Sequence, residues 1–273
     1  MKETNVVTYV LLVVLAIAFI FPFVYLVGGS LKSNQEALMN PDKVLPSEYH
    51  WENFVKVSEV LNIGRQTLNS CVMTFTVTFG QIVISALAGY AFARIKFVGR
   101  DLLFIIFLAT LIVPFELLFV PLYIMIAKLG WINTYWALIL PSLGNPFAIF
   151  IFRQFFLTVP TELEEASAID GAGYLRTFFE LMLPLSGPAI ASVFILTWLA
   201  EWSTLLKPLL FTTSKEMYTL QVGLNFLNRG AQVTTPTIAW LLAGITLASL
   251  PAIGMFLVLQ KRFVESIAQT GLK

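Results

Sequence analysis

The sequence predicts an all-α membrane protein, and three observations support this fold class. Hydrophobic residues make up 58% of the 273 residues, and charged residues make up only 12%, about half the share found in an ordinary soluble domain. Apolar segments also recur that reach the roughly 20 residues a helix needs to cross a bilayer. Because a soluble core of this size has no room for so much apolar surface, we expect residues 1–273 to form a single transmembrane domain.

Six segments meet the length requirement, and we predict a transmembrane helix in each. The first is broken only by Pro22 and has no obvious cleavage site after it, so we expect it to be retained and not removed as a signal peptide. Residues 31–66 and 212–237 are polar and mixed, and we predict loops there. The predicted spans are about residues 7–29, 68–95, 102–127, 135–157, 187–211 and 238–260.

The middle spans carry residues that an unbroken apolar helix avoids. The second contains small and hydroxyl-bearing residues between Ser70 and Gly89, which let helix backbones approach closely in lipid. The third and fourth contain prolines, which membranes tolerate where neighbours or water satisfy the freed carbonyl groups. We therefore expect both to be irregular near their middle. The residues concerned are Pro114, Glu116 and Pro121 in the third span, and Pro141, Gly144, Asn145 and Pro146 in the fourth.

The remaining composition excludes several function classes. A net charge of +1 gives no reason to expect a nucleic-acid partner. Cys71 is the only cysteine and His50 the only histidine, which excludes an internal disulfide and argues against a metal centre. The sequence has no GxxxxGK[ST], HExxH or GxSxG motif. We therefore predict no enzyme, no cofactor in this chain, and energy supplied by an ion gradient or by another subunit.

The stretch from Thr161 to Pro184, between the fourth and fifth spans, has the richest concentration of acidic residues in the chain. Thr161 followed by Glu164 predicts a capping box at the start of a helix, and acidic residues in a first turn suit the helix dipole. Gly171 predicts a break where a tight turn forms, and a second helical piece is expected to run to Pro184. A plain connecting loop rarely combines these features, so we predict a surface-exposed helix-turn-helix that docks a partner.

Six spans place both termini on one side of the membrane, together with residues 161–184. Basic residues beside helix ends indicate the cytoplasmic side. The two sides hold nearly equal numbers of basic residues, so their position next to the helix ends, more than their number, favours cytoplasmic termini. Those on the predicted inner side are Arg94, Lys96, Arg100, Arg153, Lys261 and Arg262, and those in the outer loops are Lys32, Lys43, Lys56, Arg65, Lys128, Lys215 and Arg229.

The acidic stretch also carries a family pattern. Glu165-Ala166-Ser167, then Gly171, then Leu181-Met182-Leu183-Pro184 resembles the EAA motif of ABC importer permeases, which reads E-A-A, three residues, G, nine residues and I-x-L-P. Ser167 in place of the second alanine and Leu181 in place of isoleucine are mild departures. Residues 153–172 are similar to the carbohydrate-uptake permeases of the maltose type in particular.

The resemblance covers essentially the whole chain. It extends to the first outer loop, to the connection between the third and fourth spans at residues 129–137, and to residues 260–264. One departure lies in the fifth span, where relatives commonly carry a W-N-D-like run. This chain reads Trp202-Ser203-Thr204 there, with Glu201 before the run and Lys207 after it.

The resemblance implies a multi-pass subunit of a bacterial or archaeal cytoplasmic membrane, with both termini in the cytoplasm. In such importers two permease chains form the pathway, and we expect a second, homologous permease as the partner. Two ATP-binding cassette subunits bind ATP and Mg on the cytoplasmic face, and an extracytoplasmic solute-binding protein delivers the solute. This chain would then form half of the pathway for a sugar or sugar-like solute.

The resemblance also assigns the acidic stretch as a cytoplasmic coupling helix between the fourth and fifth spans, which seats on the ATPase. The carboxylate of Glu165 suits a basic or donor group across such an interface. Asp170 is either a contact of this kind or a local cap. The residues implied in coupling are Glu165, Ala166, Ser167, Asp170, Gly171, Leu183 and Pro184.

Polar and aromatic residues at membrane depth are the candidates for the solute pathway: Glu116, Asn145, Trp198, Glu201 and Trp202. A charge within a span marks a pathway or a buried partner, so Glu201 either lines the pathway or forms a salt bridge with Lys207 or with the partner permease. Trp198 and Trp202 lie one helical turn apart on one face. They either stack on a sugar or pack between helices.

Two other function classes remain as alternatives. A stand-alone ion-coupled carrier agrees with six spans and broken helices, but the two halves show no internal repeat and the EAA-like stretch would be unexplained. A membrane-embedded hydrolase would need a motif that the sequence lacks. The sequence does not name the solute, and it leaves open whether this chain or the partner permease holds the solute site.

Overall fold

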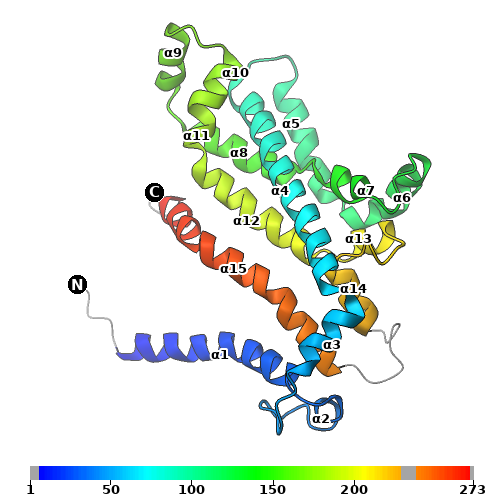
Figure 1. The fold of residues 1–273 in the computed structure, drawn as a ribbon. Coiled ribbons are helices and arrows are strands. Elements are labelled where there is room, and N and C mark those ends of the chain that lie inside the picture. Colours follow the sequence, from blue (N-terminus) through cyan, green and yellow to red (C-terminus); the bar gives the residue numbers. More distant parts are fainter. Residues whose placement is uncertain (1–5, 229–237, 271–273) are drawn as a thin grey trace. The chain divides into compact units, whose positions relative to one another are not determined.

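The computed structural model describes residues 6–228 and 238–270, with side chains described up to 258 and at Gln260 (Figure 1). All regular elements in these residues are helical. The α-helices are α1 (Val6–Ser30), α2 (Asn34–Met39), α3 (Glu52–Leu61), α4 (Ile63–Arg94), α5 (Arg100–Ala109), α6 (Phe119–Lys128), α7 (Tyr135–Ile139), α8 (Pro146–Thr158), α9 (Thr161–Ile169), α10 (Tyr174–Thr177), α11 (Leu183–Leu185), α12 (Gly187–Ser203), α13 (Leu206–Phe211), α14 (Leu220–Asn228) and α15 (Ile238–Thr270). The shorter turns are η1 (Thr110–Ile112), η2 (Phe115–Leu118), η3 (Leu140–Ser142) and the π turn η4 (Phe178–Met182).

Some predicted features fall outside this description. Arg229 is not among the described residues, and the side chains of Lys261 and Arg262 are not described. The same holds for the side chains of residues 263 and 264, which belong to the segment that resembles the family's C-terminal end.

Membrane-length helices confirm the all-α membrane fold class. In the described residues, α1, α4 and residues 238–258 of α15 are long and apolar enough to cross a membrane as straight helices. Three further pairs of helical segments reach that length only together, with a bend inside each pair. Counting every bent pair as one span gives up to six, so the number of six spans stays a prediction.

The bends lie where the sequence predicts irregular helices. The angle is 91° between Arg100–Ile112 and Phe115–Lys128, on either side of Pro114, and 43° between Tyr135–Ser142 and Pro146–Thr158. A proline lacks the amide hydrogen that a continuous helix needs, so both interruptions follow from the sequence. The irregular middle predicted for the third and fourth spans is therefore confirmed.

A third bend, of 75°, separates Tyr174–Leu185 from Gly187–Ser203. The helical piece predicted to end at Pro184 runs one residue further, to Leu185, and Ser186 interrupts it. The π turn η4 directly precedes α11, which contains this proline. Prolines and π turns are the usual causes of sharp kinks, and together they redirect the chain into α12.

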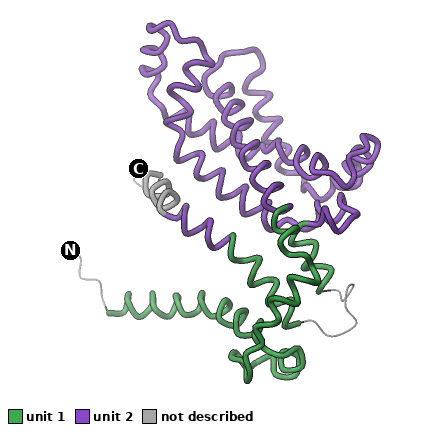
Figure 2. Tube along the Cα trace, in the orientation of Figure 1, with its two compact units in different colours: residues 1–68, 219–251 green, residues 69–218, 252–273 purple. Residues whose placement is uncertain are grey.

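The described chain divides into two compact units (Figure 2). Unit 1 contains residues 1–68 and 219–251, and unit 2 contains residues 69–218 and 252–273. The single domain predicted over residues 1–273 stays a prediction.

In unit 1, buried polar groups hold the segment that follows α1. Lys32 is only 2% exposed, and its ammonium donates to the carbonyl oxygens of Asn40, at 3.0 Å, and of Lys43. Asn53 donates to the carbonyl oxygens of Ser30 and Lys32 at 2.9 and 2.8 Å. These bonds fold residues 30–53 into an ordered segment.

Two of the predicted loops in the chain are partly helical. Residues 31–66 contain α2, α3 and the start of α4, and residues 212–237 contain α14. The prediction of plain loops is wrong here because apolar residues recur at helical spacing within a mostly polar composition. The residues that these helices bury include Val57 and Leu61 of α3 and Leu220, Leu224 and Leu227 of α14.

In unit 2, α4, α8 and α12 pack into one apolar core. Gly89 permits a close approach of α4 to α8, because a Cβ atom there would lie 2.6 Å from Cβ of Phe152 and 2.9 Å from the backbone nitrogen of Arg153. Helices in membranes commonly approach at such small residues. The buried core residues include Ile82, Ala86 and Tyr90 of α4, Ala148, Phe152 and Phe156 of α8, and Ala189 and Val193 of α12.

Candidate functional site

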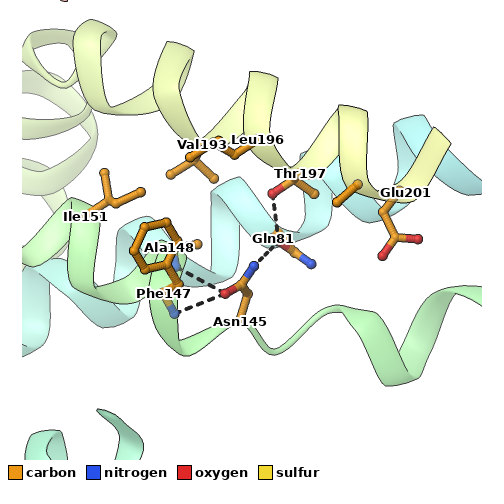
Figure 3. Close-up of a pocket in the computed structure, with 10 residues that line it drawn as sticks. Gln81, Asn145, Phe147, Ala148, Ile151, Val193, Leu196, Thr197 and Glu201 are labelled. Carbon is orange, nitrogen blue, oxygen red and sulfur yellow. Dashed lines mark hydrogen bonds between the residues drawn. The ribbon is translucent and has the colours of Figure 1, made fainter. Parts of the chain in front are cut away.

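A cavity of about 300 Å³ lies in unit 2 among α4, α8 and α12 (Figure 3). Polar side chains from all three helices meet at one end of it, and apolar side chains line the other. The lining residues are Gln81, Asn145, Phe147, Ala148, Ile151, Val193, Leu196, Thr197, Ala200 and Glu201.

The amide of Gln81 is the centre of the polar end. Its Oε1 accepts hydrogen bonds from Asn145, at 3.0 Å, and from the hydroxyl of Thr197, at 2.9 Å. Its Nε2 donates to the carbonyl oxygen of Ser142 at 2.5 Å. One side chain of α4 thereby connects the turn before α8 with the middle of α12 (Figure 3).

Asn145 is placed by its capping function. It is the N-cap residue of α8, and its Oδ1 accepts from the backbone amides of Phe147 and Ala148 at 3.0 and 3.2 Å. Asparagine is among the preferred residues at this position because its side chain satisfies otherwise unpaired amides. The cap leaves its NH₂ group free to donate to Gln81.

Glu201 lines the cavity and forms an ion pair with Lys207. Lys207 Nζ lies 2.5 Å from Glu201 Oε2, and it also donates to the hydroxyl of Ser142 at 2.6 Å. The two side chains are 3% and 13% exposed, with lysine the more buried. Of the two sequence hypotheses for Glu201, pathway residue and salt bridge, the structure contains the geometry of both.

The remaining pathway candidates lie elsewhere. Trp198 and Trp202 are both 4% exposed and stack on each other, with ring centroids 5.3 Å apart and planes 6° apart. Neither is among the residues that line the cavity. Glu116 is exposed on η2, and no other described residue pairs with it.

Sequence reasoning did not single out Gln81 or Thr197. An uncharged amide inside a long apolar run is a usable signal, because polar groups at membrane depth need a partner. Gln81 lies in such a run, but the small hydroxyl-bearing residues around it make it inconspicuous in the sequence. Thr197 has no comparable signal, since a threonine within a membrane helix often bonds only to its own backbone.

The second candidate surface is α9, which occupies the end of unit 2 where α4 ends and α5 begins (Figure 1). No residue of α9 is buried. Leu163 and Ile169 are 42% and 87% exposed, and Glu162 and Glu165 are exposed beside them. α9 therefore exposes both acidic and apolar side chains that a partner could contact.

The predicted capping box at Thr161 is wrong. The N-cap residue is Pro160, Thr161 is already helical, and no side chain caps this end. Glu164 is occupied elsewhere, since its Oε1 lies 2.8 Å from Nε of Arg94. That contact is an ion pair without hydrogen-bond alignment. Burial raises the pKa of the Glu164 carboxyl, and the charge of Arg94 offsets this only in part.

Arg94 contacts α8 as well. Its Nη2 donates to the carbonyl oxygens of Phe156, at 2.7 Å, and of Val159. Both oxygens belong to the end of α8, where helix carbonyls lack partners and a cation suits the dipole. The last residue of α4 therefore links the end of α8 to the start of α9.

The residues predicted for coupling fall on or next to α9. Gly171 has φ +80°, which confirms the tight turn predicted there, because glycine adopts this conformation without strain. Asp170 is the C-cap residue of α9 and is exposed. The hydroxyl of Ser167 lies 3.0 Å from that of Thr177, which gives the serine at this motif position a bond that alanine lacks.

The other predicted coupling residues divide by burial. Glu165, Ala166 and Pro184 are exposed, and Leu183 packs at the edge of the unit 2 core. Exposure of the first two leaves them available to a partner. Leu183 instead fixes the chain that leaves the stretch.

These observations define the class of protein as a multi-pass helical membrane protein with a polar cavity among its helices and a short acidic helix exposed beyond them. Residues 81–269 match the family described as binding-protein-dependent transport system inner membrane component, and the chain belongs to this family. The resemblance to ABC importer permeases of carbohydrate uptake is thereby confirmed.

Relatives match over almost the whole chain. The arabinooligosaccharides transport system permease protein AraQ of Halalkalibacterium halodurans is 34% identical over 265 residues, covering 94% of this chain and 93% of that protein. The sn-glycerol-3-phosphate transport system permease protein UgpE of Brucella abortus is 33% identical over 276 residues, covering 98% and 97%. These relatives are transport permease subunits and not enzymes.

A solved structure shares the fold. It is a bacterial ABC transporter involved in the import of the acidic polysaccharide alginate, with a TM-score of 0.80 and 21% identity, covering 94% of this chain and 95% of that one. This likeness concerns the fold, and the family match and the permease relatives show that the chain is a permease subunit of an ABC importer.

Proposed function

We propose that this chain forms half of the translocation pathway of an ATP-driven, binding-protein-dependent importer, and that its solute is an uncharged sugar or sugar-like compound. The observation that carries the proposal is the cavity of unit 2, where Gln81, Asn145 and Thr197 meet at membrane depth. Amide and hydroxyl groups both donate and accept hydrogen bonds, as sugar hydroxyls do.

Charge in the cavity supports an uncharged solute over a phosphorylated one. Glu201 is the only charged residue that lines it. The nearby cation, Lys207, is engaged by Glu201 and Ser142. An anionic solute would meet a carboxylate that Lys207 already neutralises and no free cation among the described lining residues, so nothing there would compensate its charge. The family includes permeases for both kinds of solute, so this distinction matters.

The exposed face of α9 supports coupling to an ATPase. We propose that Glu165, Ala166, Ser167, Asp170 and Gly171, with Leu183 and Pro184 behind them, make the chain's coupling element. Glu165 is exposed and supplies a charge for a basic partner.

The family's architecture supplies the rest of the proposal. We propose a homologous but different permease as partner, two ATPase subunits that hold ATP and Mg, and an extracytoplasmic solute-binding protein. The membrane is then the cytoplasmic membrane of a bacterium or archaeon. The six predicted spans would form one permease domain with both termini in the cytoplasm.

Uptake in proteoliposomes tests the coupling function. Gly171→Val should insert normally and lose ATP-dependent uptake, because a β-branched residue at φ +80° costs about 1–2 kcal/mol in backbone strain. Gly171→Asn is the matched control, since asparagine tolerates this conformation. Normal uptake by the valine variant would contradict the proposal, as would uptake by this chain without an ATPase under an ion gradient alone.

Competition tests the solute class. We expect uptake by the complete importer to be inhibited by uncharged arabinose oligosaccharides and not by sn-glycerol 3-phosphate. Glu201→Gln should reduce the difference in inhibition between the two compounds, because it leaves the Lys207 charge unneutralised near the cavity. Equal inhibition by both compounds in the unmodified importer would contradict an uncharged solute.

A further inference from the structure

We propose that Arg94 is a positioning residue that braces the joint between α8 and α9, so that a displacement of α9 reaches α4 and α8 and is not absorbed at the joint. This function rests on the proposed coupling by α9. It adds the residue that makes the connection stiff.

The joint itself is short and extended. α8 ends at Thr158 and α9 begins at Thr161, so only two residues separate the helices. Val159 has φ −72° and ψ 131°, and Pro160 has φ −59° and ψ 136°. Rotation about these few bonds swings the whole of α9, because each residue has two soft dihedral angles and proline has one.

Apolar packing does not fix α9 against such rotation. No residue of the helix is buried, and its two large apolar side chains, Leu163 and Ile169, are 42% and 87% exposed. The orientation of α9 must therefore come from polar contacts at its ends. At the C-terminal end, the contact between Ser167 and Thr177 ties the helix to α10.

At the N-terminal end, one guanidinium group contacts both sides of the joint. Arg94 donates to the carbonyl oxygens of Phe156, in α8 before the joint, and of Val159, within it, and pairs with Glu164, which follows it. The Arg94 side chain is 10% exposed and that of Glu164 is 19% exposed, so solvent screens the pair weakly. Arginine suits this position because its planar group presents several donors in a fixed geometry.

The helices that Arg94 holds, α4 and α8, extend from the joint to the cavity. Arg94 ends α4, and Gln81 lies 13 residues earlier on the same helix, a distance of about 20 Å along the axis. The close contact at Gly89 joins α4 to α8 between these points. A displacement passed through Arg94 therefore moves Gln81 of α4 and Asn145 at the start of α8 together.

The test uses the complete importer with its partner subunits in lipid nanodiscs. Cys71 is the only cysteine of this chain, so a Cys71→Ala background accepts a single reporter, Ala200→Cys, in the cavity lining. The rate at which a membrane-impermeant maleimide labels this reporter is measured with and without ATP plus vanadate. ATP hydrolysis by the same preparation is measured in parallel.

Glu164→Gln is the primary variant, because it removes the charge facing Arg94 and leaves the arginine bonds to α8. We expect ATP hydrolysis to stay within about twofold of the parent, while the nucleotide-dependent change in labelling falls roughly threefold to thirtyfold. Arg94→Lys, which keeps the charge and loses the planar group, should act in the same direction. The double variant should lose no more than the worse single variant, as expected for residues that act through each other.

Glu162→Gln is the matched control, since Glu162 is exposed on the same turn of α9. It should retain the full change in labelling. The brace is overturned if Glu164→Gln and Arg94→Lys respond to nucleotide like the parent, or if Glu162→Gln loses as much as they do. A parent complex with no response to nucleotide would overturn the coupling function of α9 and the brace with it.

Discussion

Unit 2 holds two ion pairs that are alike in chemistry and different in what they connect. Lys207 and Glu201 lie beside the cavity, with side chains 3% and 13% exposed. Arg94 and Glu164 lie at the start of α9, at 10% and 19%. In the first pair both ions come from one stretch of chain, only six positions apart. Both pairs join two helices, but α12 and α13 of the first pair follow each other directly, whereas α4 and α9 of the second are far apart in the sequence.

The difference shows how the same interaction serves two purposes. The pair beside the cavity neutralises a charge that would otherwise be costly inside a membrane. The lysine ammonium donates there to Glu201 and to the hydroxyl of Ser142 on η3. The pair at α9 uses an arginine, whose additional donors reach backbone carbonyls of a third element. The first pair neutralises a charge and ties neighbouring elements beside the cavity, whereas the second joins the ends of α4 and α8 to α9.

The largest effect that we expect comes from breaking the neutralising pair. Lys207→Met leaves Glu201 unpaired at a largely buried position, and removal of one partner from a buried pair costs about 3–5 kcal/mol. The thermal inactivation temperature of the purified importer should fall accordingly. The double variant Lys207→Met with Glu201→Gln should recover most of the loss. A double variant as unstable as the single one would show that Lys207 does more than neutralise.

A smaller effect is expected at the cavity turn. Asn145→Ala removes the N-cap of α8, which costs about 1 kcal/mol, and also removes the donor to Gln81. Asn145→Asp retains the cap acceptor and adds a negative charge that suits the start of the helix, but it replaces the donor to Gln81 with a second acceptor oxygen. We expect the aspartate variant to keep its thermal stability better than the alanine variant while both reduce uptake. Equal stability would mean that the cap contributes little.

At the other end of α9, Ser167→Ala should have a milder effect. It removes the contact with Thr177, and an ordinary hydrogen bond contributes about 0.5–1.5 kcal/mol. ATP-dependent uptake should fall only slightly, because Arg94 still holds the other end of the helix. A loss of uptake as severe as that of Glu164→Gln would show that Ser167 holds α9 in place at least as strongly as Arg94 does.

The smallest expected effect on stability is a response to pH. Burial raises the pKa of Glu164 above its ordinary value of 4.5, so the folded chain takes up this proton more readily than the unfolded chain. Its contribution to stability is therefore fully present below pH 4.5 and is lost as pH rises through the raised pKa. Acidification should weaken the labelling response without unfolding the protein, and Glu164→Gln should abolish that pH dependence.

Much of the fold follows directly from the sequence. Apolar segments and few charges predict membrane helices, and prolines predict where they bend, because both rules depend on local chemistry. Gly171 likewise predicts its turn. The capping box fails at Thr161 because Pro160 takes the N-cap position and Glu164 is captured by Arg94, which is distant in sequence. A local motif has no information about such a competitor.

Some of the residues that line the cavity were also predictable from local sequence. Asn145 and Glu201 stand out as polar residues in apolar spans, and both line it. Trp198 and Trp202 also stand out, yet they stack on each other. Helical spacing predicts that two aromatic rings share a face, but only the packing of neighbouring helices decides whether that face meets a solute. Gln81 belongs to the cavity because it bonds to Asn145 and Thr197, and the sequence alone does not show that these residues are neighbours.

The contact at Gly89 also limits how such a permease changes its solute during evolution. Any larger residue there would collide with the backbone of α8. Only glycine fits at this spacing between α4 and α8. A lineage that turns to a bulkier solute has little scope to part these two helices. Under the proposed solute site, a bulkier solute would be accommodated by exchanging side chains on α12 and on the turn before α8, so new specificities would arise by substitution within a fixed frame.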